Sequence, residues 1–164
     1  MAFRIEDTGV FRGLVQFLSI LLPSGSVTAA NIAAAAGVEA TKLEHQHREI
    51  YRQESDTTVV SEDRVVHVVK GTTGNLKTFR AGSVVANAGA ATITVDLHKN
   101  GSTILTAPIS LDNGDSAYDL VAGVISSEPV VADDVLEVVV VATAGGGTIG
   151  KGVFASLDVH EDVS

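Results

Sequence analysis

The stretch Ala91–Leu111, ATITVDLHKNGSTILTAPISL, decides the fold of this chain. Every second residue from Ile93 to Leu97 is apolar and the residues between them are polar, which is the pattern of a strand with one buried face. Asn100-Gly101 follows and supplies two residues that tolerate positive φ, as a type I′ turn requires. The alternation resumes beyond the turn, at Leu105, Ala107, Ile109 and Leu111. The stretch therefore predicts a β-hairpin.

The rest of the second half of the chain repeats this pattern at regular intervals. Runs rich in Val, Ile and Thr are separated by short segments of Gly, Asn and Asp, which are turn-forming residues. The candidate strands are Thr57–Val60, Arg64–Lys70, Asn75–Val85, Ala91–Lys99, Ser102–Leu111, Ser116–Val124, Val135–Thr143 and Lys151–His160. We expect a mainly-β fold, a jelly-roll-like β-sandwich of about eight strands, over residues 58–164.

Residues 1–57 differ from this pattern and predict an N-terminal arm. Apolar residues in Phe11–Leu22 recur at the spacing of one helix face, which favours an amphipathic helix. A second, short helix is expected over Ala29–Ala36, with Gly37 at its C-terminal end. The polar stretch Glu39–Glu54 has few apolar residues, so we expect it to form an extended or partly helical connector between the arm and the sandwich.

Composition limits the classes of partner. The formal net charge of −9 repels phosphate groups, so we expect no nucleic acid partner. No stretch reaches the roughly 20 apolar residues of a membrane-spanning helix, so we expect no membrane partner. The chain has no cysteine, which removes disulfides, thiol nucleophiles and cysteine-based zinc sites from consideration.

No motif in the sequence indicates a catalytic, cofactor-binding or metal-binding site. The chain has neither a nucleophile elbow nor a phosphate-binding glycine loop, so we expect it to have no enzymatic activity and no cofactor. His45 and His47 are two residues apart and lack a third ligand at a zinc-site spacing. We interpret these histidines as part of a solvated or interface-facing segment, and we expect no metal site. The acidic turn Asp112–Asp115 is explained by turn formation alone.

The candidate strand Val135–Thr143 is apolar on both faces. If its even-numbered residues fill the core, then Val139 and Val141 project from the opposite face, where only Glu137 is charged. An apolar face of this kind is normally covered. Either the N-terminal arm of the same chain or a neighbouring subunit would cover it, and the sequence leaves both alternatives open.

Two stretches, Glu39–Gln53 (EATKLEHQHREIYRQ) and Ile93–Leu105 (ITVDLHKNGSTIL), together with the order of an apolar arm and a sandwich, resemble the head decoration, or cement, proteins of tailed bacteriophages. The resemblance implies a β-sandwich, often a jelly roll, that assembles as a homotrimer on the outer surface of the virion capsid. It further implies that the protein contacts the phage major capsid protein and braces the junctions between capsomers.

On this interpretation the interface residues fall into three groups. The arm supplies an apolar contact and the connector supplies polar contacts. The candidate strand Val135–Thr143, which is apolar on both faces, supplies its outward valines. These residues are Phe11, Leu14, Leu18 and Leu22; Lys42, His45, His47, Arg48 and Arg52; and Val139 and Val141. Two alternatives remain. One is a phage tail, fibre or baseplate module that binds carbohydrate on the host surface, and the other is a secreted β-sandwich adhesin or lectin.

Overall fold

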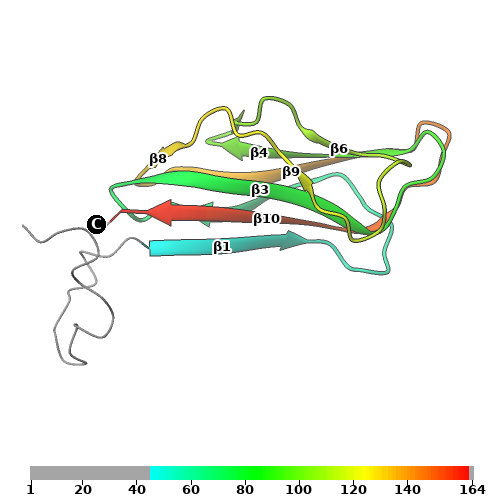
Figure 1. The fold of residues 1–164 in the computed structure, drawn as a ribbon, viewed down its shortest axis with the longest axis horizontal. Coiled ribbons are helices and arrows are strands. Elements are labelled where there is room, and N and C mark those ends of the chain that lie inside the picture. The colour runs from blue at the N-terminus through cyan, green and yellow to red at the C-terminus, as the bar shows by residue number, and fades with distance from the viewer. Residues whose placement is uncertain (1–44, 163–164) are drawn as a thin grey trace, which may run out of the picture. The chain divides into compact units, whose positions relative to one another are not determined.

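The computed structural model describes residues 45–162, and these form ten β-strands and no helix. The strands make two antiparallel five-stranded sheets that face each other (Figure 1). The predicted mainly-β sandwich is therefore confirmed. The expected helices at Phe11–Leu22 and Ala29–Ala36 lie outside the described residues, as does Lys42. The described residues include no helix that is long and apolar enough to cross a bilayer.

Each sheet contains strands from distant parts of the sequence. Sheet A has the order β1-β10-β3-β7, with β8 also paired to β3, and sheet B has the order β2-β9-β4-β5, with β6 also paired to β4. The strands of sheet A are β1 (His45–Arg52), β3 (Thr73–Val85), β7 (Val121–Ala122), β8 (Pro129–Val131) and β10 (Lys151–Glu161). Those of sheet B are β2 (Glu62–Val68), β4 (Thr92–Lys99), β5 (Ser102–Thr103), β6 (Ile109–Leu111) and β9 (Val135–Thr143).

The core lies between the two sheets and is almost entirely aliphatic. Ile93, Val95 and Leu97 of β4 are fully buried, as the alternation predicts. Leu157 of β10 and Phe79 of β3 face them from sheet A and are equally buried. Because branched side chains pack well on a pleated surface, Val, Ile and Leu can fill this space without tryptophan.

The Asn100-Gly101 turn is confirmed. Asn100 has φ 52° and Gly101 has φ 77°, the two positive values that a type I′ turn needs. The strand after the turn is shorter than expected, because Ile104 and Leu105 are both buried and the alternation breaks there. The predicted strand Ser102–Leu111 is therefore divided into β5 and β6.

Other strands also differ from the expectation. Thr57–Val60 forms only an isolated bridge, between Thr58 and Lys151. Ser116–Val124 contributes only the two residues of β7, and β8 forms where no strand was expected. These segments are rich in Gly, Pro and Ser or carry alternating patterns too short to fix a strand, so pairing partners decide where a strand forms.

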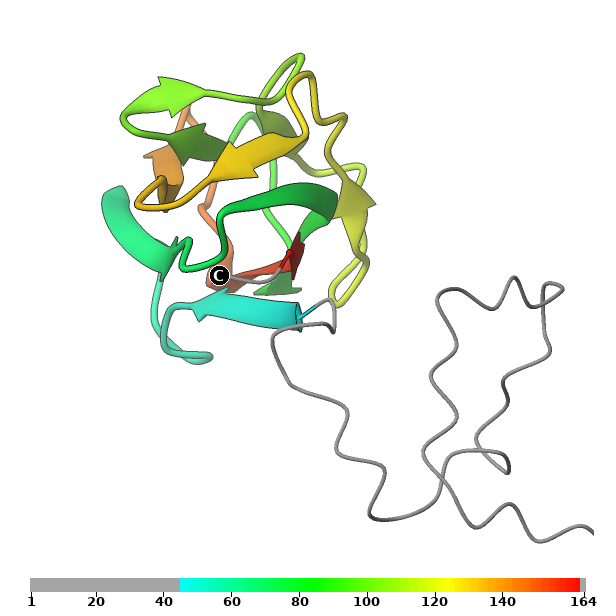
Figure 2. The same cartoon turned by 90° about the vertical axis from the view of Figure 1, so that its left-hand side faces the viewer.

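The largest correction concerns β1. The sequence predicts that residues 45–52 belong to a connector, yet β1 pairs with β10 over its whole length, from His45 opposite Glu161 to Arg52 opposite Phe154. The β-sandwich therefore begins before the expected boundary at residue 57. The end-on view in Figure 2 shows β1, in cyan, at the edge of its sheet. Few apolar residues mark β1 because its inward side chains are largely polar, and those of Glu49 and Tyr51 form hydrogen bonds with residues of β2.

Candidate interaction surfaces

The residues of β1 divide between two faces of sheet A. His45, His47, Glu49 and Tyr51 lie opposite inward residues of β10, such as Leu157 and Val159, and therefore face sheet B. The residues between them, including Arg48 and Arg52, project from the outer face. The two histidines and the two arginines that were predicted to be interface residues therefore lie on opposite faces of sheet A. Their roles in binding remain predictions, as do those of Phe11, Leu14, Leu18, Leu22 and Lys42 outside the described residues.

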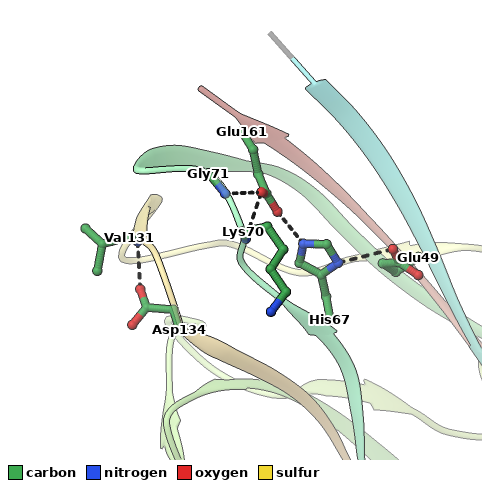
Figure 3. A network of polar contacts seen from close by, with 7 residues as sticks. All are labelled: Glu49, His67, Lys70, Gly71, Val131, Asp134 and Glu161. Atoms are coloured by element: carbon green, nitrogen blue, oxygen red, sulfur yellow. Dashed lines mark hydrogen bonds and ion pairs between the residues drawn. The ribbon is translucent and has the colours of Figure 1, made fainter. Parts of the chain in front are cut away.

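The inward side of β1 takes part in a histidine–carboxylate cluster formed by Glu49, His67 and Glu161 (Figure 3). Nε2 of His67 contacts Oε1 of Glu161, and Nδ1 lies 3.2 Å from Oε1 of Glu49. The other oxygen of Glu161 accepts hydrogen bonds from the backbone N–H groups of Gly71, at 2.6 Å, and Lys70, at 2.9 Å. Glu161 is only 2% exposed, and these donors satisfy both of its oxygens.

Two opposing effects act on the Glu161 carboxyl. Burial raises its pKa by disfavouring the charged form, while the hydrogen bonds from His67, Gly71 and Lys70 lower it. The hydrogen bonds outweigh burial, so the pKa of Glu161 lies below its usual value. Glu161 is therefore an ionised group held inside the sandwich by its neighbours. This role could not be predicted from the sequence, because Glu161 occurs in an acidic stretch that is typical of a solvated segment.

The histidine–carboxylate cluster connects three strands. Glu49 is on β1, His67 on β2 and Glu161 on β10, so the contacts connect the edges of both sheets. In the described part of the chain the hydrogen-bond partners of His67 are these two carboxylates. The arrangement supports a structural role, in which the cluster holds the edge strand β1 against the body.

A second set of hydrogen bonds connects β1 to β2 at the other end of β1. The hydroxyl of Tyr51 donates a hydrogen bond to Oε1 of Glu62, at 2.7 Å, and accepts one from Nε2 of Gln53, at 2.9 Å. Burial is the main cause that raises the pKa of Tyr51, and the bond to Glu62 adds to it. The guanidinium of Arg64 lies 5.5 Å from the centre of the Tyr51 ring. Tyr51 therefore joins β1 to the start of β2.

The outer face of sheet A carries a shallow depression crossed by an ion pair. Nε of Arg48 on β1 lies 2.6 Å from Oδ1 of Asp158 on β10, and Oγ1 of Thr78 on β3 donates to Oδ2 at 2.7 Å. The hydrogen bond from Arg48 and then that from Thr78 lower the pKa of Asp158. The depression has a volume of about 500 Å³, and Lys77 and His160 also line it. This surface offers charge and hydrogen bonds without an enclosed cavity.

The outer face of sheet B is different, because valines lie among its charged residues. In β9 the inward residues Leu136, Val138 and Val140 are buried, while Val139 and Val141 lie on the opposite side. Val141 is 47% exposed, and Val65 of the neighbouring strand β2 is 52% exposed. The sequence pattern therefore identified the outward valines of β9, although it did not predict that Val65 extends the same apolar surface.

No protein-family model matches this sequence, and no curated protein matches it. The fold and these surfaces are therefore the features that bear on function.

Proposed function

We propose that the protein is a non-enzymatic structural protein of a tailed bacteriophage virion, a decoration or cement protein that assembles as a homotrimer. It binds the phage major capsid protein on the outer surface of the capsid and stabilises the junctions between capsomers. Its effect comes from many weak interfaces repeated over the shell, so geometry and copy number determine it rather than one reactive site.

The observation that carries the proposal is the group of outward valines on the outer face of sheet B. Val65, Val139 and Val141 lie on neighbouring strands of a sheet, two of them about half exposed. Contiguous exposed apolar surface on a folded domain is typical of a protein interaction site. A rigid sheet that presents such a surface is suited to assembly, because binding does not require the backbone to reorder.

The strand order supports the finer assignment to a jelly roll. From β1 to β4 the chain alternates between sheets A and B at each strand, and β9 and β10 return to lie between strands that came earlier. If β5 and β6 count as one interrupted strand and β7 and β8 as another, the total is eight, four in each sheet. This is the strand number of a double-sheet jelly roll, an architecture found in viral capsid proteins and in lectins.

The experiment that tests the proposal locates the protein on the particle. Virions of the phage that encodes the chain are labelled with gold-conjugated antibodies raised against the full chain and are imaged by negative-stain electron microscopy. We expect the label on the faces of the head. Label on the tail or fibres would replace the proposal with the tail-module alternative, and virions without label would overturn both.

A further inference from the structure

The basic residues of this acidic chain are concentrated on one surface. The chain has 11 Lys and Arg residues and a net charge of −9. Eight of them lie within residues 45–162, and four of these eight project from the outer face of sheet A and define a basic face: Arg48, Arg52, Lys77 and Arg80. Lys77 reaches this face because the pairing of β3 with β10 shifts register at Lys77, between Leu76 and Thr78.

Most of the charge on the basic face lacks a partner. Arg48 is paired with Asp158. Within residues 45–162, no carboxylate forms an ion pair with Arg52, Lys77 or Arg80. The basic face therefore presents three positive charges that remain available to an external anionic group.

The outer face of sheet B carries the opposite charge. Asp63 of β2 lies beside Val139, and Glu137 of β9 lies beside Val65, so both carboxylates flank the exposed valines. Neither carboxylate is paired with a cation of the described chain. We call this surface, formed by Asp63, Val65, Glu137, Val139 and Val141, the acidic face.

The two faces also match in their apolar residues. Ile50 and Leu120 are 65% and 48% exposed beside the arginines of the basic face. Val65 and Val141 are 52% and 47% exposed on the acidic face. A contact between the two faces would bury apolar side chains at its centre and pair opposite charges around them, which is the usual composition of a protein interface.

The size of the faces is sufficient for a stable contact. The 11 residues of β10 span roughly 36 Å, and four neighbouring strands span roughly 15 to 20 Å. Each face is therefore of the same order as the roughly 800 Å² that each partner buries in a standard interface.

We propose that the basic face of one copy of this chain packs against the acidic face of a second copy. This inference rests on the proposed self-assembly of the chain and specifies which surfaces meet. The contact is heterologous, since two different surfaces take part and each copy keeps one surface free for the next. Such a contact produces a ring where the rotation between copies closes and an open stack where it does not.

Charge reversal on each face tests the inference. The molar mass of the full chain is measured by sedimentation equilibrium for the wild type, for Lys77→Glu with Arg80→Glu, for Asp63→Lys with Glu137→Lys, and for all four changes together. We expect the wild type to be oligomeric, each pair of reversals to weaken association at least tenfold, and the fourfold variant to associate again. Added salt should weaken the wild-type oligomer.

A matched control changes two carboxylates outside both faces. Glu54→Lys with Asp56→Lys alters the net charge as much as the acidic-face variant does, and both residues are exposed in the loop after β1. We expect this variant to associate like the wild type, and circular dichroism verifies that every variant is folded. An oligomer that resists both pairs of reversals would overturn the proposed contact while leaving self-assembly intact. A monomeric wild type would overturn both, and a folded fourfold variant that stays monomeric would overturn the pairing of these two faces.

Discussion

At the scale of single residues, Glu161 is the position on which the edge of the sandwich most depends. Its side chain accepts hydrogen bonds from three donors, His67 and the backbone of Lys70 and Gly71, in a site that water barely reaches. Hydrogen bonds to a charged group contribute more than those between neutral groups, and a buried donor without a partner is costly. The ionised form of Glu161 therefore stabilises the fold.

We predict that Glu161→Gln lowers the free energy of unfolding by about 1.5 to 3 kcal/mol at pH 7. Glutamine keeps the shape of the side chain, but it replaces a charged acceptor with a neutral amide. Urea denaturation of the wild type and the variant measures the difference. Asp119→Asn is the control, because Asp119 is exposed and its carboxylate accepts no hydrogen bond within residues 45–162, and we expect it to change stability by less than about 0.5 kcal/mol.

The same residue predicts a pH dependence. The pKa of Glu161 is lower in the folded chain than its usual value of 4.5, so its contribution is fully present above about pH 4.5 and is lost as the pH falls through the folded-state pKa. The stability difference between wild type and Glu161→Gln should therefore shrink as the pH falls below 4.5. A difference that does not shrink below pH 4.5 would show that the pKa of Glu161 is not lowered by folding.

At the scale of elements, the hairpin turn also fixes the neighbouring strand β9. Asn100 adopts a positive φ, and its side chain donates to Oδ1 of Asp134, at 2.7 Å, and accepts from the backbone N–H of Val135, at 2.9 Å. One residue therefore closes the β4–β5 turn and positions the start of β9. The sequence motif Asn-Gly predicted the first role, and the second depends on a contact 35 residues away in the sequence.

We predict that Asn100→Gly and Asn100→Ala differ in cost. Glycine accepts the positive φ and loses only the two side-chain hydrogen bonds, at about 1 to 2 kcal/mol in total. Alanine loses the same bonds and is also strained by the positive φ, which adds about 1 to 2 kcal/mol. Thermal and urea denaturation of both variants measure the difference. Equal costs would contradict the assignment of the turn type.

Truncations distinguish the predicted arm from the pleated body. A chain that lacks residues 1–44 retains all ten strands of the two sheets, so we expect it to unfold cooperatively like the full chain. A chain that lacks residues 1–57 also loses β1 and the buried ring of Tyr51, and we expect it to be several kcal/mol less stable or unfolded. Circular dichroism and urea denaturation measure both, and equal stability of the two truncations would contradict the role of β1.

The strands that the sequence predicted well are those whose alternation is long and aliphatic. Val135–Thr143 was predicted with its observed bounds, and Lys151–His160 differs from β10 by one residue. β1 was missed because a strand at an open edge can place polar side chains inward when His67 and Glu62 satisfy them. The charged faces were missed because they combine residues from strands that are adjacent only in the folded sheets.

At the scale of the whole molecule, the described part of the chain is a body that presents opposite charges on opposite sides. The formal net charge of −9 is a sum over the whole sequence, so it does not reveal the basic face on sheet A. The proposed assembly therefore depends on the two sheets, because they position the charges. It also depends on a repeated capsid lattice to which the copies of the protein bind.

Binding to a capsid, with stabilisation of the shell, is what the proposed function requires. Its most direct test adds the purified full chain to capsids assembled from the major capsid protein of the encoding phage in the absence of this chain. Binding is measured by cosedimentation, and the temperature of capsid disassembly by light scattering. We predict that binding saturates at a fixed ratio to the capsid protein and raises the disassembly temperature. Capsids that sediment without the chain, or that disassemble at an unchanged temperature after binding it, would contradict the claim.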